Sequence, residues 1–183
     1  QQYGDQIDSL ILCATNRIDK PKLRASLALV RSLRALRGKR HHSRLIDNMT
    51  FGAFNKAFSP NRTSHDWLSR DPQQVDRYLR DPLCGFPCTA GLWSDFIGGM
   101  LTINPKTWRK DLPIHLLAGD SDPVGEMGHG FNRHVANLRG AGLLVASDRL
   151  FPGARHELVN ETNADEVWHH ILDCLRTGTD SGA

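Results

Sequence analysis

The 183-residue sequence contains no long hydrophobic run and no recognisable targeting segment. No stretch approaches the roughly 18 consecutive apolar residues that a membrane-spanning helix requires. The first residues, QQYGDQIDSL, have neither the basic start nor the apolar run of a signal peptide, so we expect a cytoplasmic protein. A strong excess of one charge is also absent. The 23 basic and 20 acidic residues give a formal net charge of +3, too small to predict nucleic acid as the partner of the whole domain.

Cysteine is scarce, and its spacing fits neither a disulfide scaffold nor a metal site. The four cysteines are dispersed along the chain: Cys13, Cys84, Cys88 and Cys174. CGFPC is one residue longer than the redox pattern C-x-x-C, and no second cysteine pair completes a zinc site. HELVN begins like the zinc motif H-E-x-x-H, but Asn160 stands where the second histidine must ligate. We therefore expect reduced thiols, no metal and no cofactor.

The composition is ordinary for a globular protein, with 39% hydrophobic and 23% charged residues, and three short apolar runs stand out. They predict strands buried on both faces of a parallel sheet: IDSLILCAT (7–15), LPIHLLAGD (112–120) and GLLVASDRLF (142–151). Helical patterns follow the second and third runs, over 125–142 and 163–178. This alternation of strand and helix predicts an α/β fold with a parallel sheet.

A long insertion separates the first two predicted strands, because the almost one hundred residues between them far exceed a single crossover. Apolar residues at helical spacing predict four helices there: 21–38, 51–58, 71–79 and 89–103. We expect three parts in the chain: a core strand with the end of a preceding helix (1–15), a helical cap insertion (16–88) and the remaining α/β core (89–183).

One segment of the insertion is strongly basic. Between residues 31 and 44 no acidic residue occurs, and eight side chains are basic or histidine: Arg31, Arg34, Arg37, Lys39, Arg40, His41, His42 and Arg44. A solvated helix face explains such a pattern, and so does peripheral attraction of the basic helix over 21–44 to anionic lipid headgroups. Nucleic acid is disfavoured as a partner because no aromatic residue is interleaved with these cations.

The stretch LLAGDSDPVG (116–125) places a serine between two aspartates at the end of the second predicted strand. Ser121 follows the pattern G-x-S-x-G from Gly119 onward, except that Pro123 replaces the last glycine. In a nucleophile elbow that glycine lets the next helix pack closely. The two flanking carboxylates would also oppose an oxyanion beside the serine. We therefore do not expect Ser121 to be a nucleophile, and no intact G-x-S-x-G occurs in the sequence.

Asp122 is better suited to be the acid of a catalytic triad. It lies at the carboxyl end of a predicted parallel strand, where such sheets build their sites. The loop after the next strand, FPGARHEL, supplies His156. In a triad, Asp122 would hold the imidazole tautomer while His156 takes a proton from a serine. An aspartate that caps a loop and an unrelated surface histidine are the plain alternatives.

Three C-terminal segments carry a family resemblance: PIHLLAGDSDPVG, LFPGARHELVNE and EVWHHILDCL. They resemble the monoacylglycerol lipase and lysophospholipase group of α/β-hydrolases, which is also grouped with the serine aminopeptidases. FNKAFSPNRTSHDWLSRDPQQVDRYLRDPLCGF is similar to the cap region of the same group, particularly of its bacterial members. The resemblance implies a partial α/β-hydrolase fold: the last parallel strands, their flanking helices and a helical cap. It also implies that Asp122 is the triad acid and His156 the triad histidine.

The resemblance further implies that the nucleophile is outside this sequence. In the family the nucleophile precedes a helix that leads into the strand matched by IDSLILCAT, and QQYGDQ resembles the end of that helix. The elbow and the oxyanion donors would then lie about one helix length before Gln1. We expect the full-length protein to hydrolyse carboxylic esters of the acylglycerol or lysophospholipid type, and the 183 residues alone to be inactive.

Other functions remain open from the sequence. The same acid and histidine would serve an aminopeptidase or another ester or amide hydrolase, and the scaffold could also be a non-catalytic, membrane-associated or binding module. Phe51, Phe54 and Phe58 share one helical stripe, which either lines an acyl pocket for a small lipid substrate or packs against the core. The sequence does not specify an oligomeric state.

Overall fold

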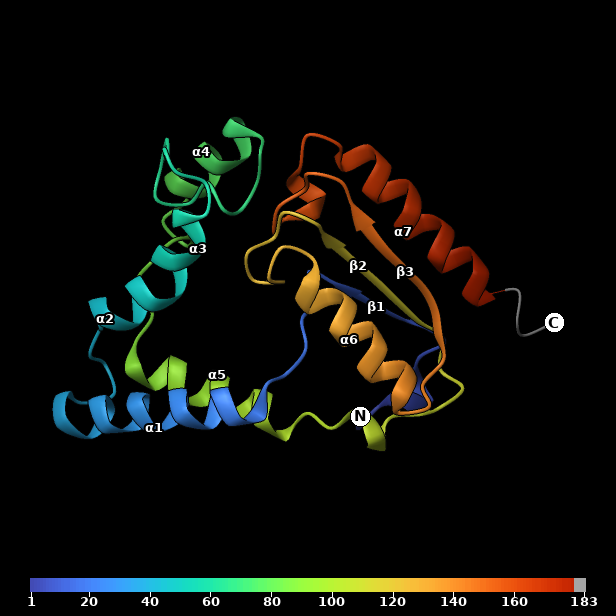
Figure 1. Ribbon diagram of the computed structural model, residues 1–183, viewed down its shortest axis with the longest axis horizontal. Coiled ribbons are helices and arrows are strands. Elements are labelled where there is room, and N and C mark those ends of the chain that lie inside the picture. Colours follow the sequence, from blue (N-terminus) through green and yellow to red (C-terminus); the bar gives the residue numbers. More distant parts are fainter. Residues whose placement is uncertain (180–183) are drawn as a thin grey trace.

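The structure is a computed structural model that describes residues 1–179, and it is built on a three-stranded parallel sheet. The strands are β1 (Leu10–Cys13), β2 (Ile114–Gly119) and β3 (Val145–Phe151), with β2 in the middle. In the register, Leu10 lies opposite Ile114, which in turn lies opposite Val145. Helix α6 (His129–Gly140) connects β2 to β3, and α7 (Ala164–Thr179) follows β3 (Figure 1). The predicted α/β class and the parallel sheet are confirmed.

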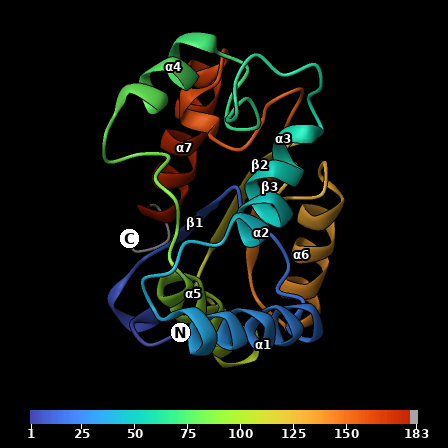
Figure 2. The same ribbon diagram turned by 90° about the vertical axis from the view of Figure 1, so that its left-hand side faces the viewer.

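Only β2 is buried along its whole length. It has a strand on either side, and Figure 2 shows α6 and α7 on opposite sides of the sheet. The expectation that all three strands are buried on both faces is wrong for β1, which is only partly buried, and for β3, where burial alternates. Both strands form edges of the described sheet, so each has a neighbouring strand on one side only.

The core on the α6 face shows why this segment is a helix. Phe131, Val135 and Leu138 recur at helical spacing, and all three are buried against alternate residues of β2, Ile114 and Leu116. On the opposite face Leu117, Phe151 and Val167 form a separate buried cluster. Burying each such side chain contributes about 1.5–3 kcal/mol. The two clusters pack β2 between two helices.

The segment between β1 and β2 forms the helical cap on the left of Figure 1. Its helices are α1 (Lys20–Arg37), α2 (Arg44–Asp47), α3 (Ala53–Lys56), α4 (Pro72–Arg80) and α5 (Ala90–Thr102). The side chain of Asp19 caps α1 by accepting from the amide of Lys22 at 3.1 Å, and Gly38, with a φ of +87°, ends the helix. These boundaries agree with the predicted helices over 21–38, 71–79 and 89–103.

The cap has a small core of its own. Leu27 and Val30 of α1 pack with Ile46, Trp93 and Ile97. Helix α5 therefore lies against α1 (Figure 2) before the chain returns to β2 through the 3-10 turn Pro105–Thr107. The division of the chain into the parts 1–15, 16–88 and 89–183 stays a prediction.

A substitution at Gly119 tests how closely the end of β2 packs against the loop after β3. A Cβ at this position would overlap the backbone carbonyl of Ala154, whereas a Cβ at Gly140, in the last turn of α6, would meet nothing. We expect Gly119→Ala to lower the free energy of unfolding by about 3 kcal/mol, because the overlapping atoms belong to the backbone. Gly140→Ala should be neutral or stabilising by up to about 1 kcal/mol. Urea unfolding measures both, and equal stabilities would contradict the close packing.

Candidate active site

Asp122 and His156 lie against each other at the carboxyl end of β2. The side chain of Asp122 is fully buried, and its Oδ2 accepts a hydrogen bond from Nδ1 of His156 at 2.9 Å. Its Oδ1 accepts from the amide of Val124, also at 2.9 Å, so that both carboxylate oxygens have donors. The two residues are 34 positions apart in the sequence, and the turn after β2 and the loop after β3 bring them together. The predicted pairing is therefore present in the structure.

The imidazole of His156 is oriented by contacts on two sides. Nδ1 is held by Asp122, and the ring packs on Trp67 of the cap, with centroids 5.1 Å apart. Within residues 1–179 no hydrogen bond engages Nε2, and the side chain is 28% exposed. The geometry leaves Nε2 as the nitrogen that can accept a proton.

Ser121 is committed to the turn rather than to His156. Its hydroxyl donates to Oδ1 of Asp120 at 2.9 Å, and its amide donates to the carbonyl of Ala154 at 3.0 Å. Oδ1 of Asp120 also accepts from the amide of Gly153 at 2.7 Å. Asp120 and Ser121 thus tie the end of β2 to the loop that carries His156, in agreement with the interpretation of Ser121 as a turn residue.

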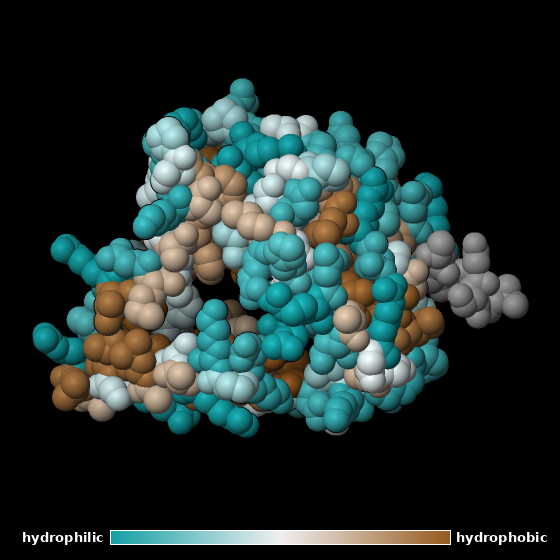
Figure 3. All heavy atoms as spheres, viewed as in Figure 1, coloured by the Kyte–Doolittle hydropathy of each residue, from teal (hydrophilic) through white to brown (hydrophobic). Residues whose placement is uncertain are grey.

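His156 lines a cavity of about 1030 Å³ between the cap and the sheet. Figure 3 shows the molecule hollowed between these two parts. Much of the lining is apolar and includes Leu10 and Leu12 of β1, Leu23 of α1 and Phe54. The cavity places an imidazole with an available nitrogen beside a surface that suits an aliphatic chain.

The three predicted pocket phenylalanines separate in the structure. Phe54 lines the cavity, whereas Phe51 packs on Trp67 and Trp93. The ring of Phe58 lies against the guanidinium of Arg155, whose Cζ is 3.9 Å from the ring centroid. Phe51 and Phe54 still share one face, since both rings contact Trp67, whereas Phe58 comes after the end of α3 at Lys56 and leaves the expected stripe.

Comparison with known proteins identifies the family of this chain. A family model described as "Serine aminopeptidase, S33" matches residues 1–163. The chain belongs to this serine aminopeptidase family. The family resemblance inferred from the sequence is therefore confirmed. No curated protein sequence matches the chain.

Solved structures show the same fold in longer proteins. A thermostable carboxyl esterase from Bacillus coagulans in complex with glycerol superposes with a TM-score of 0.84 at 26% identity, covering 96% of this chain and 58% of the esterase. A lipase in its open form superposes with a TM-score of 0.76 at 23% identity, covering 94% of this chain and 57% of the lipase. A monoacylglycerol lipase from Paleococcus ferrophilus superposes with a TM-score of 0.59 at 19% identity, covering 97% of this chain and 63% of that lipase. These similarities confirm a partial α/β-hydrolase fold, and the chain spans between 57% and 63% of these relatives' lengths.

Two further observations bear on this member of the serine aminopeptidase family. Among residues 1–179, no group of three or more histidine, cysteine or acidic side chains is arranged to hold a metal ion. No helix in the same described range is long and apolar enough to cross a membrane.

Glu161 is a site residue that the sequence patterns did not reveal. Its carboxylate is buried and accepts hydrogen bonds from Nε and the amide of Arg70 and from the amide of Arg155. Burial lowers the pKa of the Arg155 guanidinium, an effect that the carboxylates of Glu161 and Asp66 oppose. Glu161 therefore joins the cap, through Arg70, to the loop that carries His156. Its only sequence signal is the acid that ends LFPGARHELVNE.

Replacing Glu161 tests whether its buried ion pair contributes more to the free energy of unfolding than an exposed ion pair does. We expect Glu161→Gln to lower the free energy of unfolding by about 2 kcal/mol or more, because an amide NH₂ would face backbone donors and Arg70 would lose its ion pair. Glu166→Gln is the matched control, since its pair with Arg149 is on the surface and should contribute less than about 1 kcal/mol. Chemical denaturation of the two variants checks this, and equal losses would show that Glu161 has no special role.

Proposed function

We propose that this chain supplies the acid and the histidine of a Ser-Asp-His ester hydrolase that acts on acylglycerol or lysophospholipid-type substrates. The observation that carries the proposal is the hydrogen bond between the buried carboxylate of Asp122 and Nδ1 of His156. Membership of the serine aminopeptidase family and the likeness to a carboxyl esterase support it. The nucleophilic serine is proposed to lie before Gln1, as the family resemblance implies.

The proposed reaction uses the two sides of the imidazole in turn. Nε2 of His156 removes the proton of the serine as its oxygen attacks the ester carbonyl, and Asp122 stabilises the imidazolium that forms. The imidazolium then protonates the departing alcohol, which leaves an acyl-enzyme. Water attacks the acyl-enzyme with the same histidine as base, and the fatty acid is released. Asp122 keeps the proton on Nδ1 throughout, so that Nε2 always faces the reaction.

The cavity favours a small lipid ester as substrate. Leu10, Leu12, Leu23 and Phe54 offer apolar surface next to His156, which suits an acyl chain better than a peptide backbone with its unpaired polar groups. An aminopeptidase with the same acid and histidine is the competing proposal. Comparing monoacylglycerols and lysophospholipids with aminoacyl-arylamides as substrates of the full-length protein distinguishes the two.

Variants of the full-length protein test the proposed triad. We expect Asp122→Asn to lower kcat by about 10⁴-fold, because the amide favours the wrong imidazole tautomer, and His156→Ala to lower it at least as much. Ser121→Ala is the control and should leave kcat within a few-fold, since this hydroxyl donates to Asp120. The 183-residue chain alone should not hydrolyse the ester. Hydrolysis by this chain that survives Ser121→Ala would contradict the proposed position of the nucleophile.

We also propose that a cytoplasmic enzyme of this kind contacts membranes peripherally through the basic end of the cap. Leu36, Leu45 and Met49 are exposed there, beside Arg37 and Arg44. Figure 3 shows apolar surface gathered at the end of the cap at the lower left. Exposed apolar side chains next to cations match the interface between acyl chains and anionic headgroups.

Sedimentation with lipid vesicles checks the membrane contact. Binding of the chain should be stronger to vesicles with anionic phospholipid than to neutral ones, and Arg37→Gln should weaken it about five-fold. Leu36→Ser should weaken it as well, whereas Leu172→Ser, at an exposed leucine of α7, should not. If the two leucine variants behave alike, the end of the cap is not the contact surface.

A further inference from the structure

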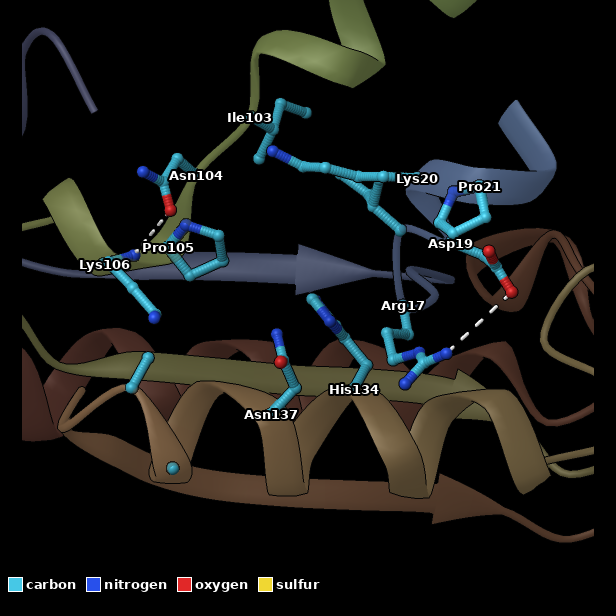
Figure 4. Close-up of a pocket in the computed structure, with 13 residues that line it drawn as sticks. Arg17, Asp19, Lys20, Pro21, Ile103, Asn104, Pro105, Lys106, His134 and Asn137 are labelled. Atoms are coloured by element: carbon cyan, nitrogen blue, oxygen red, sulfur yellow. Dashed lines mark hydrogen bonds and ion pairs between the residues drawn. The ribbon is translucent and has the colours of Figure 1, made fainter. Parts of the chain in front are cut away.

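A second cavity, of about 800 Å³, lies between α6, the residues before α1 and the turn that follows α5 (Figure 4). Three cationic side chains line it, Arg17, Lys20 and Lys106, and its one acidic lining residue is Asp19. Arg17 and Asp19 are 3.8 Å apart and both are nearly half exposed, so their mutual attraction is weak. The lining therefore has an excess of positive charge available to a ligand.

Polar side chains with unused hydrogen-bonding capacity line the same space. His134 of α6 is 5% exposed, and its Nδ1 is enclosed without any hydrogen bond. Figure 4 shows His134 and Asn137 pointing from α6 into the cavity, opposite Asn104 and Lys106. Oδ1 of Asn104 accepts from the amide of Lys106 at 3.3 Å, which leaves its NH₂ group as a donor. A buried nitrogen with no partner costs free energy, and a bound ligand toward which the His134 ring turned would relieve that cost.

The electrostatics of His134 agree with this role. Burial lowers the pKa of its imidazole, so the ring is neutral near pH 7 and offers one N–H donor and one acceptor. The charge in the cavity then comes from Arg17, Lys20 and Lys106, while His134, Asn104 and Asn137 supply neutral donors. That is the pattern of sites in which cations balance an anion and neutral groups orient its oxygens.

We propose that this cavity binds a phosphate monoester. A phosphate dianion has three terminal oxygens for the three cations and the neutral donors, whereas a carboxylate has two oxygens and one charge. The remaining lining is apolar or small, including Ile18, Pro21 and Ile103, and suits a short organic substituent. The site shares Arg17, Ile103 and His134 with the cavity that His156 lines. This inference does not depend on the proposed hydrolase activity, because binding is measurable in the chain itself.

Calorimetric titration of the 183-residue chain with glycerol 3-phosphate tests the site. We expect saturable binding that Lys20→Gln and Lys106→Gln each weaken about ten-fold, the effect of losing one charge-assisted contact. Lys56→Gln is the matched control, because this exposed lysine at the end of α3 lines neither cavity. NMR should show shifts of the side-chain amides of Asn104 and Asn137 on titration. Absence of saturable binding, or equal weakening by Lys56→Gln, would overturn the proposal.

A second variant separates binding from folding. His134→Leu removes the unpartnered nitrogen, so the free chain should unfold with unchanged or higher free energy while its affinity for glycerol 3-phosphate falls. Unchanged affinity in this variant would overturn the role of His134.

Comparing the affinities of inorganic phosphate and a short-chain monoacylglycerol phosphate with that of glycerol 3-phosphate identifies the source of the phosphate group. Equal affinity for all three ligands indicates a site for free phosphate, and tighter binding of the acylated ligand indicates a lipid headgroup. Acetate binding as tightly as glycerol 3-phosphate would overturn the preference for phosphate.

Discussion

Full burial of the Asp122 carboxylate is the constraint on which the rest of the site depends. A buried carboxylate is costly unless donors satisfy its oxygens, and here one donor is the amide of Val124 and the other is the ring of His156. The first belongs to the same turn, but the second comes from the loop after β3. The charge is therefore stable only when β2 and β3 are paired in the observed register. The same pairing that forms the sheet creates the candidate active site.

The loop that carries His156 is held from the cap as well as from the sheet. Glu161 accepts from Arg70 and Arg155, and Trp67 packs on the imidazole. The contacts of Arg70 with Glu161 and of Trp67 with His156 join residues about ninety positions apart, so they form only after the insertion has folded over the core. The cap is thus part of the machinery that orients the histidine, besides forming one wall of the cavity.

Two cavities of different character meet beneath this cap. The one beside His156 is lined largely by apolar side chains such as Leu12 and Phe54, and the neighbouring one is cationic, with Lys20 and Lys106. Hydrophobic burial favours an acyl chain in the first, and Coulomb attraction favours an anion in the second. Since His134 lines both, a ligand with an apolar and an anionic end fits the chemistry of the combined space.

Local sequence patterns were sufficient to predict the α/β class, most of the helix boundaries and the pairing of Asp122 with His156. Those features follow from local patterns: apolar periodicity, capping residues, and polar side chains placed just after strands. The three-dimensional packing was needed to show that β1 and β3 are edges of the described sheet and that Phe54, rather than Phe51, lines the cavity. It was also needed to show that Glu161 and His134 are buried, one fully paired and the other without a partner. Periodicity describes which face of an element is apolar, but burial and hydrogen bonding between segments far apart depend on how those elements pack in three dimensions.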